Sequence, residues 1–155
     1  MSTGARFQFI RIDPTDQIRM ASWIHHISRL TGAPAEQATV TDGPVYVWTL
    51  AAGNHRVLAR SASAFASVEE GWVDIERLVE AREALAPRMV RLESSRGYGW
   101  LLLDDGTPAM TCARWYAMER DRRESLRSAR LGLDRLALDP RRAGEELTVA
   151  GGEPR

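Results

Sequence analysis

The feature that most constrains the fold is a pattern of residues that occurs twice in the chain. The segment YVWTLAAGNHRVLARS, residues 46–61, is similar to YGWLLLDDGTPAMTCA, residues 98–113. Each copy predicts a strand, a turn with Gly, Asn or Asp, and a returning apolar strand. Such self-similarity is typical of a repeated unit, although the alternation alone also fits any amphipathic strand. Three aligned pairs are identical: Tyr46 with Tyr98, Trp48 with Trp100 and Leu50 with Leu102.

An amphipathic helix is predicted after each hairpin. Apolar residues recur at helical spacing over 69–86, and Pro87 is expected to end this first helix. Strands are predicted before the two hairpins, over 38–40 and over 89–95. The second helix is predicted over 115–138, and its expected inward-facing residues are Trp115, Met118, Leu126, Ala129, Leu133 and Leu136.

The residues before the repeats predict one more strand and one more helix. The segment RFQFIRI, residues 6–12, alternates in a way that favours a strand. Asp13 is expected to cap the helix, with Pro14 at its first position and Asp16 near its positive end. The helix is expected to end near Thr31. Its apolar face is predicted from residues at helical spacing: Met20, Ile24, Ile27 and Leu30.

We therefore predict an α+β fold with a duplicated antiparallel β-sheet, amphipathic helices packed on one face, and an N-terminal strand–helix extension. A lone hairpin is marginally stable in water, whereas two copies can bury both tryptophans under two helices. The chain has 155 residues, and a single domain is expected over 1–140. Residues 141–155 are expected to form a mobile tail or to add a short strand over 146–150. The expected parts of the domain are the strand–helix extension at 1–34, repeat 1 at 38–87 and repeat 2 at 88–138.

Composition narrows the classes of function. The 21 basic and 21 acidic residues balance, so no global field attracts nucleic acid or an anionic membrane. Every basic side chain is arginine, which excludes a Schiff-base lysine and a P-loop lysine. The single cysteine, Cys112, has no partner for a disulfide, and no apolar run is long enough to span a bilayer. A cytoplasmic protein without cofactor or metal is expected.

Residues of the first copy carry a resemblance to a known family. They are Trp48, Leu50, Ala52, Asn54, Val57, Leu58 and Ser61, with Phe65 near the place of a following aromatic. This pattern resembles the repeat of the YegP-like family, small bacterial and archaeal proteins of unassigned function. The family repeat has an aromatic-rich strand, Leu-x-Ala-x-Asn-Gly, an apolar return strand, Ser, and an aromatic before a helix.

The resemblance covers roughly residues 38–138 and is incomplete. His55 replaces the glycine of the motif, and the aromatic lies one residue late. In the second copy Trp100 and Leu102 fit, whereas three positions depart: Asp104, Gly106 and Ala113. The resemblance implies two repeats that share one antiparallel sheet with helices on one face. It implies no catalytic residues.

Several polar residues have catalytic or metal-binding chemistry, but each also has a simpler structural role. His25 and His26 point about 100° apart on a helix and are poorly placed to chelate one metal. His55 lies at a predicted hairpin tip, and Cys112 is typical of a small buried hydrophobe. Asp104–Asp105 matches no calcium-loop spacing and favours a turn. An enzyme with a site assembled from His55, Asp104 and Asp105 stays an open alternative.

The most distinctive polar pattern is a row of arginines on the predicted last helix. The row can bind phosphates or acidic side chains, and the nearby Trp115 and Tyr116 can stack on bases. The simpler interpretation is a solvated surface, because Glu119 and Glu124 are spaced for ion pairs within the helix. Its members recur at steps of three, four and three: Arg120, Arg123, Arg127 and Arg130.

These observations favour a non-enzymatic interaction or regulatory module that acts through a sheet edge or through the arginine-rich last helix. A protein is the expected partner. The alternative is a nucleic-acid-binding protein that uses the helix face over 120–130. No membrane association is expected. A monomer is expected because two repeats in one chain lessen the need for a dimer.

Overall fold

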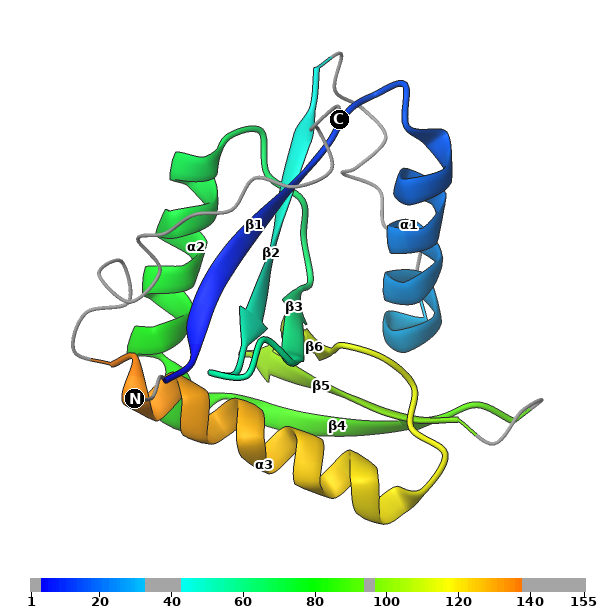
Figure 1. The fold of residues 1–155 in the computed structure, drawn as a ribbon. Helices are drawn as coiled ribbons and strands as arrows, with labels where there is room; N and C mark the ends of the chain where they lie inside the picture. The colour runs from blue at the N-terminus through cyan, green and yellow to red at the C-terminus, as the bar shows by residue number, and fades with distance from the viewer. Residues whose placement is uncertain (1–3, 33–42, 94–96, 138–155) are drawn as a thin grey trace.

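The computed structural model describes residues 4–32, 43–93 and 97–137 (Figure 1). The strands predicted over 38–40 and 146–150, and the predicted tail, lie outside these residues. The elements are β1 (Arg6–Ile12), α1 (Gln17–Thr31), β2 (Val45–Ala51), β3 (Val57–Ser61), α2 (Val68–Glu80), the 3₁₀ turn η2 (Arg82–Ala84), β4 (Ala86–Arg91), β5 (Tyr98–Asp104), β6 (Thr107–Cys112) and α3 (Glu119–Arg135).

The six strands form one antiparallel sheet in the order β1-β2-β3-β6-β5-β4, which confirms the predicted α+β class. β3 and β6 pair at the centre of the sheet. From the centre outward, one half has the order β3, β2, β1 and the other half has the order β6, β5, β4, so the two halves are arranged in the same way. The sheet is strongly twisted, so that β4 and β5 run across the direction of β1 and β2 in Figure 1.

The two aligned tryptophans occupy corresponding positions in the two halves. Trp48 and Trp100 are both fully buried in the same core cluster. The indole N–H of Trp48 donates to Asp74 Oδ2 on α2 at 3.0 Å, and that of Trp100 donates to Ser125 Oγ on α3 at 2.9 Å. Each indole therefore links its strand to the helix that covers its half of the sheet.

The backbone contacts of the two tryptophans also correspond. The backbone N–H of Trp48 donates to Ser61 Oγ at 3.1 Å, whereas that of Trp100 donates to Cys112 Sγ at 3.3 Å. Ser61 and Cys112 are each the last residue of a return strand, β3 and β6. The last residue of the return strand thus accepts the hydrogen bond from the tryptophan N–H in both halves, through a hydroxyl in β3 and through a thiol in β6.

The helices of the two halves, α2 and α3, pack against the same core on one face of the sheet, as predicted, and α1 of the N-terminal extension lies on the other face. Strand alternation places Phe9 beside Trp48 on one face, where Phe9 packs on Trp72 of α2 with ring centroids 5.4 Å apart. Figure 1 shows α2 and α1 on opposite sides of β1 and β2. The cluster beneath α1 is separate from the main core and contains Ile12, Trp23, Ile27, Val45 and Val47.

The predicted start of α1 is corrected by the structure. The N-cap is Asp16, whose Oδ1 accepts from the backbone N–H of Arg19 at 3.1 Å. Asp13 and Pro14 instead belong to the preceding turn, in which the Asp13 carbonyl accepts from the N–H of Asp16 at 2.9 Å. The helix ends at Thr31 as predicted, and Gly32 follows with a φ of 79°.

The end predicted for the helix over 69–86 is also wrong. α2 ends at Glu80, η2 follows, and Pro87 lies inside strand β4 opposite Leu102. β4 is an outermost strand of the described sheet, where a residue without an N–H is tolerated. The strand predicted over 89–95 accordingly begins earlier, at Ala86, and ends at Arg91.

The last helix begins later than predicted. Trp115 precedes α3, and Tyr116 is extended because it exchanges backbone hydrogen bonds with Tyr98 at 2.8 and 2.9 Å. Met118 is the N-cap residue and is 49% exposed, so the inward orientation predicted for it is wrong. Trp115, which was also predicted to face inward, is half-buried, and the remaining predicted inward positions are buried: Leu126, Ala129, Leu133 and Leu136.

The turn between β2 and β3 does not have its positive φ at a Gly, Asn or Asp, the residues predicted for it. The positive φ, 68°, belongs to His55. Asn54 supports the turn through Oδ1, which accepts from the N–H of Arg56 at 3.1 Å. In the second hairpin Asp105 and Gly106 both have positive φ, as the predicted turn requires.

Replacing Gly71 with alanine is expected to destabilise the protein, although alanine is the better helix former. A Cβ at this position would overlap the ring of Phe9, which is fully buried against Trp72. We expect a loss of about 1–2 kcal/mol after the helix-propensity gain of about 1 kcal/mol is included. Urea unfolding measures this loss.

Gly132→Ala is the matched control. A Cβ there lies 3.3 Å from Ala5 Cβ and 3.4 Å from Leu50 Cδ2, so only slight crowding offsets the propensity gain. We expect this variant to stay within about 1 kcal/mol of the wild type. Equal stability of the two variants would contradict the close approach of β1 and α2.

Candidate functional site

The predicted arginine row lies on α3 but does not act as one unit. Arg120 and Arg123 are exposed. Arg127 forms an ion pair with Glu124 at 3.6 Å, as the spacing predicted. Arg130 is half-buried, and its Nη2 donates to the carbonyl oxygen of Leu85 at 3.2 Å. The C-terminal member of the row thus attaches α3 to the segment before β4.

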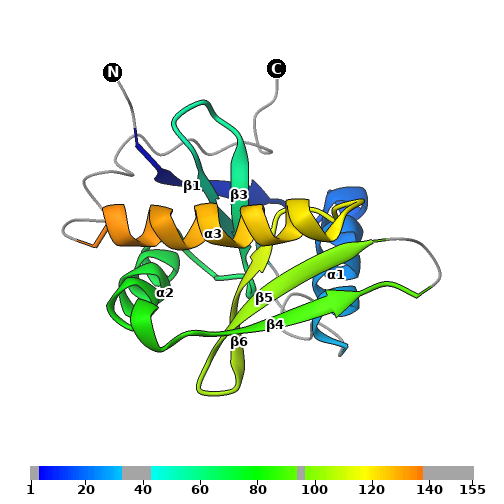
Figure 2. The same cartoon turned by 90° about the horizontal axis from the view of Figure 1, so that it is seen from below.

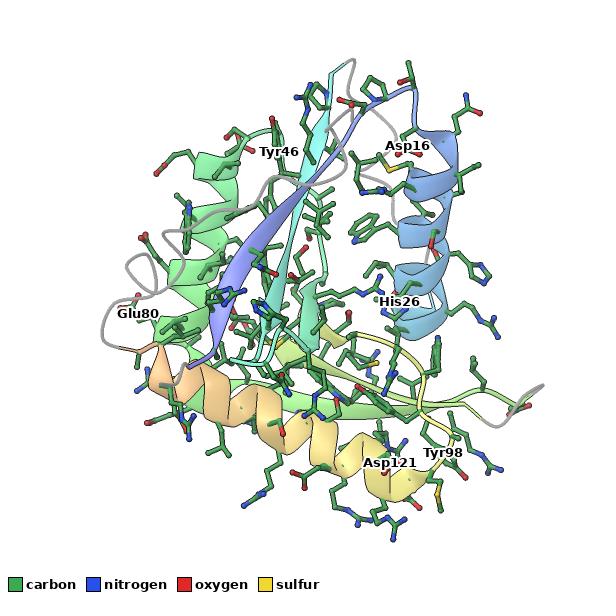
Figure 3. All side chains as sticks on the ribbon, viewed as in Figure 1. Asp16, His26, Tyr46, Glu80, Tyr98 and Asp121 are labelled. Atoms are coloured by element: carbon green, nitrogen blue, oxygen red, sulfur yellow. The ribbon has the colours of Figure 1, made fainter. Side chains whose placement is uncertain are left out.

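A further arginine of α3 has a structural role that the sequence pattern did not indicate. Arg122 is buried, and its Nη1 donates to the carbonyl oxygen of Val90 at 3.2 Å. Its Nη2 pairs with Glu119 at 3.2 Å, and its guanidinium lies 5.2 Å from the centre of the Tyr98 ring. Figure 3 shows Tyr98 close to the beginning of α3.

A cleft of about 390 Å³ lies where β3 and the segment after β6 separate. β3 and β6 pair only between residues 59–61 and residues 110–112. The residues just before this part of β3 and just after β6 diverge from each other and help to line the cleft. Arg56, Arg60 and Arg114 line this cleft, and we call it the arginine cleft. The α3 wall carries Asp121, Glu124 and Ser125, and Figure 3 shows Asp121 at the beginning of that helix.

The arginines of the cleft are available for an anion. Within residues 4–32, 43–93 and 97–137, no ion pair engages Arg56, Arg60 or Arg114. The guanidinium of Arg114 lies 5.3 Å from the centre of the Tyr116 ring, which orients it beside the cleft. Arg60 is half-buried, and burial lowers its pKa. Guanidinium groups in such a setting favour carboxylate or phosphate ligands.

A histidine and the cysteine lie next to Arg60. His26 of α1 donates through Nε2 to the carbonyl oxygen of Cys112 at 2.9 Å. Burial, and then the charge of Arg60, lowers the pKa of His26 to about 4, so its ring is neutral at pH 7. Burial raises the pKa of the Cys112 thiol to about 11, so it stays protonated and is a weak nucleophile at neutral pH.

The other residues weighed for catalysis are far apart. His55 lies in the β2–β3 turn and shares a 2.6 Å hydrogen bond with Arg6, whereas Asp104 and Asp105 lie at the β5–β6 turn. Figure 2 shows these two turns at opposite ends of the sheet, so the structure does not bring the three residues together. Within the described part of the chain, no three His, Cys, Asp or Glu residues are grouped to hold a metal ion. Nor does that part contain a helix long and apolar enough to cross a membrane.

No protein-family model and no curated protein matches the sequence. Among solved structures, the chain is similar to the solution NMR structure of YegP from E. coli, a protein of unknown function. The TM-score is 0.50 at 12% sequence identity, and the match covers 86% of this chain and 89% of that chain. Likeness at this identity shows the fold alone. The YegP-like fold expected from the sequence is therefore confirmed.

Proposed function

We propose that the protein is a non-enzymatic interaction module that binds an acidic segment of a partner protein in the arginine cleft and along the beginning of α3. The observation that carries this proposal is the gathering of Arg56, Arg60 and Arg114, none of which forms an ion pair within the described residues, although Asp121 and Glu124 also line the cleft. Arg120 and Arg123 are exposed on α3, the helix that also lines the cleft, and add two further cationic groups beside it.

The partial burial of the nearby aromatic residues favours a protein partner over nucleic acid. Binding of single strands relies on exposed aromatic rings on which bases stack. Trp115 packs against the main core cluster, and the ring of Tyr116 is half-buried beside Arg114. The balanced net charge also provides no broad field for a polyanion.

The cleft is also favoured over the sheet edge as the place of contact. β1 and β4 are the outermost strands of the described sheet. In β4, Pro87 has no N–H to donate to an added strand, and the strand also carries Arg88 and Arg91. Proline and charge on an edge strand discourage strand addition.

The proposal includes the tandem repeat predicted from the sequence. It is supported by the matching strand order of the two halves and by the corresponding hydrogen bonds of Trp48 and Trp100. When Ser61 is aligned with Cys112, the counterpart of Arg60 is Thr111. Arginine at this position thus belongs to only one copy, as expected of a residue that serves binding instead of the common scaffold.

Arg56→Gln/Arg114→Gln is the variant that tests the proposed function. We expect it to bind a fluorescein-labelled hexaglutamate peptide about tenfold more weakly than the wild type, because two cationic hydrogen-bond donors are lost. The measurement is fluorescence anisotropy at low salt. Arg88→Gln, at an exposed position of β4, is the matched control and should bind like the wild type.

Two results would overturn the proposal. The first is equal affinity of the double variant and the wild type for the acidic peptide. The second is tighter binding of a single-stranded oligonucleotide than of the peptide, with loss of that binding in the double variant. The second result would assign the same arginines to nucleic acid.

A further inference from the structure

A second hollow lies between α1 and the face of the sheet formed by β1, β2 and β3. Its volume is about 270 Å³, and we call it the α1 pocket. Its walls are largely apolar, with Ile10 and Val47 from the sheet and Trp23 from α1. Arg60 lines one side of it and also lines the arginine cleft. An apolar pocket with a few polar groups is the usual form of a small-molecule site.

The charge of Arg60 is not compensated in this pocket. No Asp or Glu contributes to the lining, and among the described residues Arg60 has no ion pair. Its neighbours across the strands are Thr49 and Thr111, which are neutral. His26 is neutral at pH 7 and therefore adds no second positive charge beside the guanidinium. A half-buried cation without a counter-ion favours an anionic ligand.

Trp23 provides an independent indication of a ligand. Its side chain is only 4% exposed, and its Nε1–H is buried with no acceptor among the described residues. Buried polar groups almost always have a hydrogen-bond partner, so such an exception calls for an explanation. Because Trp23 lines the pocket, a bound molecule with an oxygen acceptor can satisfy this group.

We infer that the α1 pocket binds a small carboxylic acid with an apolar, ring-sized body. One carboxylate oxygen pairs with Arg60, the other accepts from the Nε1–H of Trp23, and the body packs against Ile10 and Val47. The size agrees, since a cavity of about 150 Å³ accommodates benzene and 270 Å³ leaves room for a short acidic chain. Inorganic phosphate would satisfy the charge of Arg60 but would leave the apolar walls uncovered.

The test uses 3-phenylpropionate as the probe and its neutral isostere 3-phenylpropanamide as the comparison. Titration of the ¹⁵N-labelled protein is followed at the indole N–H signal of Trp23, which is assigned from its loss in Trp23→Phe. We expect a saturable shift with a dissociation constant of about 1 mM or tighter for the acid. The amide should bind about tenfold more weakly, because it lacks the charge that pairs with Arg60.

Variants of Arg60 separate a charge contact from general apolar binding. Arg60→Gln should reduce the affinity for the acid about tenfold, to the level of the amide, and Arg60→Lys should retain part of it. Arg114→Gln, which changes the arginine cleft but not the α1 pocket, should leave acid binding unchanged. The inference is overturned if acid and amide bind equally. It is also overturned if Arg60→Gln binds the acid like the wild type, or if no saturation occurs at about ten times the expected constant.

Discussion

Replacing Trp48 or Trp100 with alanine is expected to lower the free energy of unfolding by about 3–5 kcal/mol in each case. Both side chains are fully buried and pack in one cluster with residues of α2 and α3. Each change leaves a cavity and also removes an indole hydrogen bond, to Asp74 in one half and to Ser125 in the other. The loss is a large part of the stability of a small domain, which is about 5–15 kcal/mol.

Urea unfolding followed by circular dichroism measures the two losses. Trp115→Ala is the matched control, since Trp115 is only half-buried and its removal should cost clearly less, about 1–2 kcal/mol. Similar losses for Trp48→Ala and Trp100→Ala are expected because the two rings have corresponding places in the sheet. A loss below about 1 kcal/mol for either of them would contradict a shared core beneath the two helices.

The hairpins and their inward-facing residues could be predicted from the sequence because these features are local. The alternation of Tyr46, Trp48 and Leu50 with smaller residues predicts that these three side chains share one face of β2, although the structure buries both faces of the strand. Asp105 and Gly106 specify the second turn by their tolerance of positive φ. These signals act within a few residues, and tertiary packing did not override them.

The ends of the helices could not be predicted, because long-range pairing decides them. Pro87 was expected to end a helix, but it forms part of β4 because residues 86–91 pair along β5. Tyr116 was expected to be helical, but its backbone pairs with Tyr98 across the entry to α3. In both cases a hydrogen-bonded partner distant in sequence determined the local conformation.

The difference between local and long-range interactions also explains which parts of the candidate site could be predicted from the sequence and which could not. The arginine row on α3 was visible because helical spacing is local, yet the contact of Arg130 with Leu85 depends on the tertiary fold. Arg56, Arg60 and Arg114 come from two segments that only strand pairing brings together. One local signal existed, since Arg60 is the charged residue of a return strand, VLARS, that is otherwise apolar up to its last residue. A charge at such a position suggests a role beyond packing.

His26 is expected to make the stability of the protein depend on pH between about 4 and 6.5. Burial and the nearby Arg60 lower the pKa of His26 from 6.5 to about 4 in the folded state. Between these two values the unfolded chain binds a proton that the folded chain does not, so stability falls as the pH falls. Each tenfold change in proton affinity is worth about 1.4 kcal/mol, which gives about 3 kcal/mol for the whole window. Because the ring is only half-buried, solvent screening reduces the expected loss to about 2 kcal/mol.

His26→Gln is the variant that isolates this contribution from the carboxylates, which also titrate in acid. A glutamine amide can still donate to the Cys112 carbonyl oxygen that accepts from His26 Nε2, but it cannot take up a proton. Urea unfolding of both proteins at pH 7, 5.5 and 4 gives the difference in stability at each pH. The wild type should lose about 2 kcal/mol more than His26→Gln between pH 7 and pH 4. Parallel curves for the two proteins would mean that the imidazole titrates normally in the folded state, and that α1 does not shield it beside Arg60.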